Sequence, residues 1–89
     1  MTFRLPETAR KALIRSALRA RDDDRVTELL TQACPHLDAE TRWRAFVEVV
    51  DAWDRRQSAR ASILIANMIF ADDQAREALQ NADESQTSG

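Results

Sequence analysis

The chain has 89 residues, of which 44% are hydrophobic and 31% charged, a balance typical of one small globular domain. Its single Gly is the last residue and its two Pro are at positions 6 and 35, which excludes a Gly-rich phosphate loop and argues against an all-β fold. The net charge of −2 conceals a split: residues 1–21 hold six basic groups and one acidic group, and residues 22–89 hold seven basic and fourteen acidic groups. Such a split indicates either a basic arm for an anionic partner or two oppositely charged halves that pack on each other, and we favour the packing.

The first two predicted helices cover about residues 6–21 and 23–33. Pro6 suits the first turn of a helix, where its missing N–H is not needed. Three consecutive aspartates, 22–24, supply a cap and favourable negative charge at the start of the second helix, and Pro35 ends it. The apolar stripe of the first helix recurs at spacings of three and four residues: Ala9, Leu13, Ala17 and Ala20.

The third predicted helix covers about residues 38–54, with Asp38 as its N-cap. Its apolar stripe predicts a core face made of Trp43, Phe46, Val47, Val50 and Trp53. The two tryptophans lie near several arginines, an arrangement that can stack on nucleic-acid bases, but their shared stripe favours core packing. The fourth predicted helix covers about residues 58–80, and a strand over residues 62–70 is the alternative because isoleucine favours strands.

The junction between the last two helices contains neither Gly nor Pro. A continuous helix over residues 38–80 would be about 65 Å long and would need a partner chain along its length. We favour a turn near residues 55–58, with Ser58 as the N-cap, because the intervening arginines are difficult to bury. The sequence therefore predicts an all-α four-helix bundle in a single domain, residues 1–80, followed by a disordered polar tail, residues 81–89.

Few residues carry candidate chemistry. Cys34 is the only cysteine, which excludes an intrachain disulfide and suggests a reducing compartment, and no signal or membrane span is found, so we expect a cytoplasmic protein. Cys34 and His36 supply two of the four ligands of a zinc site, and no second cluster completes it. We therefore expect Cys34 to pack at the end of the second helix, His36 to lie in an exposed loop, and Asp72 and Asp73 to form a solvated helix face. No catalytic, metal or cofactor site is predicted, and an enzyme is not expected.

The basic N-terminal segment is the main candidate for an anion contact. Thr2 and Arg4 alternate with apolar neighbours, so a short strand followed by two helices loosely resembles a ribbon-helix-helix DNA-binding domain. That resemblance implies paired strands that read the major groove of DNA. It also implies a phosphate at the start of the second helix, where this chain carries three aspartates. The candidate contact residues for nucleic acid are Arg4, Lys11, Arg15 and Arg19.

The strongest functional prediction comes from residues 63–71, which are apolar on every side of the predicted helix except at Asn67. Three other short helices can barely cover such a segment, so a second polypeptide is expected to complete the core, with a homodimer as the simplest form. The predicted function is a small intracellular helical protein–protein interaction module, such as a regulator, adaptor or accessory subunit. A nucleic-acid-binding regulator is the alternative. The predicted interface residues are Ile63, Ile65, Asn67, Ile69 and Phe70.

Overall fold

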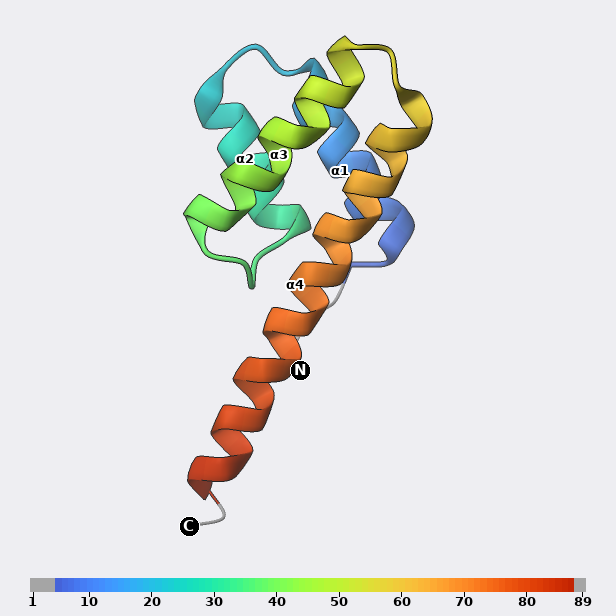
Figure 1. The fold of residues 1–89 in the computed structure, drawn as a ribbon. Helices are drawn as coiled ribbons and strands as arrows, with labels where there is room; N and C mark the ends of the chain where they lie inside the picture. Colours follow the sequence, from blue (N-terminus) through green and yellow to red (C-terminus); the bar gives the residue numbers. More distant parts are fainter. Residues whose placement is uncertain (1–4, 88–89) are drawn as a thin grey trace.

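The computed structural model describes the backbone of residues 5–87 and the side chains of residues 5–82. This part of the chain forms four helices and no strand: α1 (Glu7–Arg19), α2 (Asp23–Ala33), α3 (Ala39–Asp54) and α4 (Ser58–Thr87). Helices α1 and α2 pack as one hairpin, α3 and α4 as another, and the two hairpins enclose a shared core (Figure 1). The predicted all-α bundle is confirmed, and the alternative of a strand over residues 62–70 is wrong because α4 runs through it.

Local signals in the sequence start three of the helices. Pro6 precedes α1 and its carbonyl accepts a hydrogen bond from the N–H of Arg10. The side chain of Asp22 accepts from the N–H of Asp24 at 3.3 Å, and that of Asp38 accepts from the N–H of Thr41 at 3.1 Å, so each caps its helix. Helix α1 ends at Arg19, slightly before the predicted residue 21, because the next residue has an extended backbone with ψ 141°.

The turn between α3 and α4 confirms two separate helices. Arg56 has a φ of 59°, the left-handed conformation, and its N–H donates to the carbonyl of Trp53. The N–H of Gln57 donates to the carbonyl of Ala52 at 2.9 Å. These two bonds define a Schellman motif, which ends a helix by turning its last carbonyls back on themselves. The carbonyl of Gln57 accepts the first bond of α4, from Ala61, so Gln57 takes the N-cap position expected of Ser58.

Helix α4 is much longer than the other three and longer than predicted. It continues to Thr87, beyond the predicted end at residue 80, so the predicted disordered tail is helical over residues 81–87, and residues 88–89 lie outside the described part of the chain. The sequence offers a reason, because neither Gly nor Pro occurs between residues 58 and 88. Figure 1 shows the C-terminal part of α4 projecting from the globule, and the molecule measures 51 × 23 × 23 Å.

The core lies between the two hairpins, with each helix contributing one large, fully buried side chain: Ile14, Leu30, Val49 and Met68. The face that α3 turns inward is rotated from the predicted one. Phe46 is buried as expected, but Trp43 is 43% exposed and Trp53 is 45% exposed, so the prediction that both tryptophans pack in the core is wrong. No helix among residues 5–87 combines the length and hydrophobicity needed to cross a membrane.

Candidate functional site

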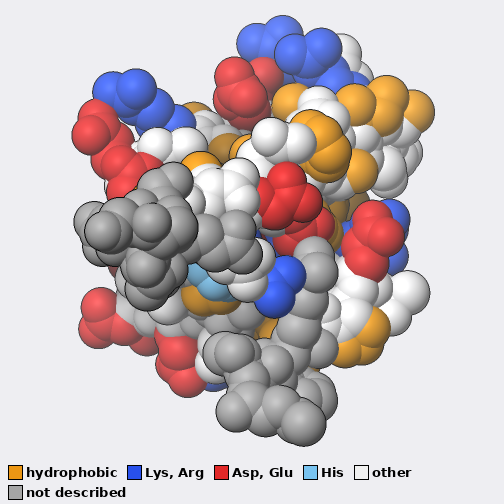
Figure 2. All heavy atoms as spheres, turned by 90° about the horizontal axis from the view of Figure 1, so that it is seen from below, with side chains coloured by type: hydrophobic (Ala, Val, Ile, Leu, Met, Phe, Trp, Pro, Cys, Tyr) orange, Lys and Arg blue, Asp and Glu red, His pale blue; other side chains and the backbone are white. Residues whose placement is uncertain are grey.

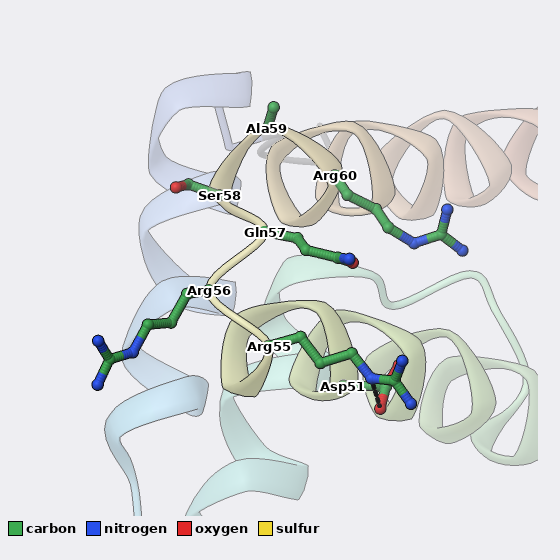
Figure 3. Close-up of a pocket in the computed structure, with 7 residues that line it drawn as sticks. All are labelled: Asp51, Arg55, Arg56, Gln57, Ser58, Ala59 and Arg60. Carbon is green, nitrogen blue, oxygen red and sulfur yellow. Dashed lines mark hydrogen bonds and ion pairs between the residues drawn. The ribbon is translucent and has the colours of Figure 1, made fainter.

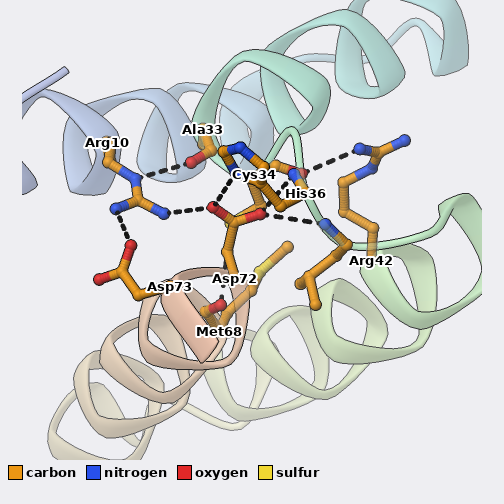
Figure 4. A network of polar contacts seen from close by, with 9 residues as sticks. Arg10, Ala33, Cys34, His36, Arg42, Met68, Asp72 and Asp73 are labelled. Carbon is orange, nitrogen blue, oxygen red and sulfur yellow. Dashed lines mark hydrogen bonds and ion pairs between the residues drawn. The ribbon is translucent and has the colours of Figure 1, made fainter. Parts of the chain in front are cut away.

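The most unusual feature of the interior is a buried arginine. Arg10 is only 5% exposed, and its guanidinium makes three hydrogen bonds, each 2.8 Å long (Figure 4). Its Nε donates to the carbonyl of Ala33, its Nη2 to Oδ2 of Asp72 and its Nη1 to Oδ1 of Asp73. Burial opposes the charge of Arg10, yet the hydrogen bond and charge of Asp73, together with the charge of Asp72, leave its pKa raised. The guanidinium therefore joins the start of α1, the end of α2 and the middle of α4.

Asp72 is the centre of this network. Its Oδ1 accepts from the backbone N–H of His36 at 2.6 Å and from that of Leu37 at 3.0 Å, and its Oδ2 lies 3.2 Å from Nδ1 of His36. At 1% exposure it is almost fully buried, so the prediction that Asp72 and Asp73 form a solvated helix face is wrong. His36 is partly buried against it rather than free in an exposed loop. The loop between α2 and α3 is thus anchored to α4 by one carboxylate.

Cys34 lies beside the network and is fully buried, as predicted. Its Sγ is 3.9 Å from the carbonyl oxygen of Met68, and its own carbonyl accepts from Nη1 of Arg42 at 2.9 Å. Burial, reinforced by the charge of Asp72, raises the pKa of the thiol to about 11. A thiol that stays protonated and inaccessible at neutral pH is a poor nucleophile and a poor metal ligand.

The network explains the split in charge along the sequence. One basic residue of the N-terminal segment, Arg10, does pack on the acidic remainder of the chain, through the aspartates of α4 rather than through the three aspartates at the start of α2. Every buried side-chain nitrogen and oxygen among the described residues has a partner, and within the same residues no cluster of His, Cys, Asp and Glu could hold a metal ion. The arrangement is complete without a ligand, so it fits a clamp between helices.

The predicted interface residues divide between the two sides of α4. Ile65 and Ile69 are each 3% exposed and belong to the chain's own core. They cannot contact a partner, which corrects the prediction for these two residues. The physical reason is that α1 and α3 pack against this side of α4. Ile63 is 60% exposed, Phe70 is 64% exposed and Asn67 is exposed, on the side that faces away from the bundle.

These outward residues form a continuous surface. Ile63, Ala66, Asn67 and Phe70 recur at helical spacing, and together we call them the outer stripe of α4. A groove of about 460 Å³ opens beside the Phe70 end of the stripe, between α4 and the start of α1. Its lining combines apolar and charged side chains: Leu5, Pro6, Glu7, Arg10, Ala66, Ile69, Phe70 and Asp73.

Other exposed apolar side chains lie on α3. Val47 is 50% exposed, and the ring of Trp43 is 6.1 Å from the ring of Phe46, with the two planes tilted by 47°. Viewed from the end at which α4 leaves the globule, acidic and basic side chains are interspersed, while hydrophobic side chains gather toward one edge (Figure 2). Exposed large hydrophobic side chains are thus found on both α3 and α4.

The structure leaves fewer of the basic N-terminal residues available to an anion than the sequence predicts. Arg4 lies outside the described residues, and Lys11 is paired with Glu7 at 3.4 Å. Arg15 and Arg19 remain exposed on α1. Arg10, another basic residue of the same segment, is buried in the core, where its charge is unavailable to an anion outside.

A second hollow, of about 650 Å³, lies at the turn between α3 and α4. Arg55, Gln57 and Arg60 extend to one side of the turn, while Arg56 and Ser58 point to the other (Figure 3). Arg55 is held by Asp51, with 3.2 Å between its Nε and the carboxylate oxygen. This hollow could not be predicted from the residue types, because it lies at a turn made by the left-handed conformation of Arg56.

Comparison with known proteins adds no assignment: no protein family, no characterised protein and no solved structure was found to match the chain.

Proposed function

We propose that this protein is a non-enzymatic helical interaction module that binds another polypeptide through the outer stripe of α4. The observation that carries the proposal is the exposure of Ile63 and Phe70, at 60% and 64%, on one face of a helix whose opposite face is fully packed. Isolated exposed apolar residues are common on proteins and need no explanation. Two large ones at helical spacing, joined by Ala66 and bordered by a groove of mixed apolar and charged lining, resemble the anchor residues of an interface.

The energetics favour coverage of this stripe. Burying a side chain of the size of isoleucine or phenylalanine contributes about 1.5–3 kcal/mol. Neither residue contributes that amount within the chain, because more than half of each side chain faces solvent. A partner that covers both residues gains this free energy without reorganising the core behind them. A cytoplasmic location, with the thiol of Cys34 free and buried, is consistent with this role.

A nucleic-acid-binding role is less well supported. Phosphate contacts draw on exposed cations, and the structure uses Arg10 inside the core and pairs Lys11 with Glu7. Retention of the chain on immobilised duplex DNA at low salt, lost in an Arg15→Glu, Arg19→Glu variant, would favour this alternative over the interaction module.

The proposal is tested by the mass of the native protein, measured by light scattering after gel filtration, alone at micromolar concentration and after mixing with extract of its source cells. We expect a complex in at least one condition. Ile63→Asp and Phe70→Asp should each abolish it, because a carboxylate cannot be buried there without a partner. Val47→Asp is the matched control, since Val47 is a comparably exposed apolar residue on α3. A single-chain mass in both conditions, or equal loss in all three variants, would contradict the proposal.

A further inference from the structure

We infer that the polypeptide covering the outer stripe is a second copy of this chain, lying antiparallel with its two-fold axis between Ala66 and Asn67. This inference rests on the proposed function, since it identifies the partner of the same surface. It follows from the symmetry of the stripe, from the groove beside it and from the charges at its two ends.

The stripe is self-complementary when it is reversed. Ile63 and Phe70 are equally distant from the midpoint between Ala66 and Asn67. Two antiparallel helices related by a two-fold axis at that midpoint therefore place Ile63 of each copy against Phe70 of the other. A small residue, Ala66, then lies level with Asn67 of the second copy, which allows the helix backbones to approach closely. Such an isologous contact closes on itself and uses each large apolar side chain once.

The groove supplies a receiving surface. It opens beside Phe70, and Ala66, Ile69 and Phe70 line its α4 side. In the antiparallel arrangement Ile63 of the second copy reaches the level of Phe70, at the rim of this groove. Ile63 is 60% exposed, so each copy offers one exposed apolar residue and one groove at symmetric positions.

The charges at the two ends of the stripe select the antiparallel direction. Arg60 lies at the end nearest the turn with α3, and Glu77 lies at the other end; both are exposed. Antiparallel pairing places Arg60 of one copy about 6 Å along the helix axis from the level of Glu77 of the other, within reach of these long side chains. Parallel pairing instead aligns like charges. Asn67, beside the two-fold axis, can hydrogen-bond to its own symmetry mate and fix the register.

Cysteine cross-linking of the full chain tests this geometry directly. In Asn67→Cys the two thiols lie beside the two-fold axis, whereas in Gln74→Cys, on the same side of α4, they lie about 22 Å apart along the helices at 1.5 Å per residue. Under mild oxidation at micromolar concentration we expect a disulfide-linked dimer from Asn67→Cys, at a rate at least about tenfold above that of Gln74→Cys. The native Cys34 does not compete, because it is fully buried. Adding Phe70→Asp to Asn67→Cys should slow cross-linking by at least about tenfold.

The cross-linking rates and the mass of the isolated protein together distinguish an antiparallel dimer from the alternatives. Equal rates for Asn67→Cys and Gln74→Cys would overturn it, because a parallel pair brings both positions together. A single-chain mass for the isolated protein, with no cross-linking of either variant, would also overturn it. In that case a complex formed only in cell extract, and lost in Phe70→Asp, would leave the proposed function standing with a different partner. Rapid cross-linking of Asn67→Cys alone would establish both the second copy and its direction.

Discussion

The interior of this small protein is organised around one charged pair, Arg10 and Asp72. Removing two charges from water is costly, and such a pair is favourable only when the remaining donors and acceptors are also satisfied. Here the carboxylate of Asp72 accepts from the backbone of His36 and Leu37, while Arg10 also donates to Ala33 and Asp73. The single side chains thus act as connectors between segments distant in the sequence.

Removing the arginine should leave Asp72 buried without a counter-charge. We expect Arg10→Met to lower the free energy of unfolding by about 3 kcal/mol, measured by urea denaturation. Arg15→Met, on the exposed side of the same helix, should change it by less than about 0.5 kcal/mol. If the two variants unfold at the same urea concentration, the buried pair does not contribute as described.

The thiol of Cys34 should make stability depend on pH in the alkaline range. Its pKa is raised from the ordinary value of 9.0 to about 11 in the folded protein, so between these values the unfolded chain loses a proton that the folded chain keeps. Stability is therefore fully present below pH 9 and falls as pH rises, by about 2 kcal/mol at pH 11. The difference in unfolding free energy between the native chain and Cys34→Ala should shrink over this range. A constant difference would show that the thiol does not titrate as inferred.

At the scale of elements, the turn between α3 and α4 determines the fold. A residue with a Cβ pays about 1–2 kcal/mol for the left-handed conformation, and Arg56 adopts it at φ 59° where Gly is the usual choice. The hydrogen bonds of the Schellman motif hold it there. This is why the sequence left open a continuous helix over residues 38–80: the residue type that normally marks such a turn is missing.

Replacing this residue tests the argument. We expect Arg56→Gly to raise the free energy of unfolding by about 0.5–1 kcal/mol, because the relief of strain exceeds the added flexibility of the unfolded chain. Arg55→Gly, one residue earlier at φ −82°, should instead lower it. Thermal unfolding of the two variants at matched concentration gives the comparison. Destabilisation by Arg56→Gly would mean that its side chain contributes more than its backbone costs.

Much of the element order could be read from the sequence, since caps and apolar periodicity are local signals. The inward face of α3 could not, because Trp43, Val47 and Val49 all fit an apolar stripe and only packing against α4 selects Val49. Only part of the candidate interface could be predicted from the sequence, for the same reason. Residues 63–71 are apolar on nearly every side of the helix, and only the positions of the other helices bury Ile65 while leaving Phe70 exposed. The pairing of Arg10 with Asp72 could not be predicted, because the two residues are 62 positions apart and no local sequence signal relates them.

At the scale of the whole molecule, the core ends well before α4 does. Met68 is 2% exposed inside the globule, whereas Leu79 is 57% exposed on the projecting part of the same helix. Isolated helical segments of this length are marginal in water, so the projecting part is held chiefly by its continuity with the packed part. The bundle is thus a compact body with a helical extension rather than four equal helices.

This boundary predicts that shortening a large apolar side chain to alanine lowers the free energy of unfolding inside the globule but not on the projecting part of α4. Met68→Ala should lower the free energy of unfolding by about 2–5 kcal/mol, because it leaves a cavity in the core. Leu79→Ala should change it by less than about 0.5 kcal/mol, measured in the same urea titration. A large loss for Leu79→Ala would place the projecting segment in a packed environment and contradict the boundary.

The position of Asp72 late in the chain has a consequence for biosynthesis. Residues 1–71 are polymerised before the carboxylate that accepts from Arg10 and from the loop at His36 has been made. A nascent chain halted before that point holds an arginine that lacks two of its three acceptors, Asp72 and Asp73, and keeps only the carbonyl of Ala33. Completion of the fold therefore waits for the last helix to be translated, and premature termination should yield fragments that proteases degrade quickly.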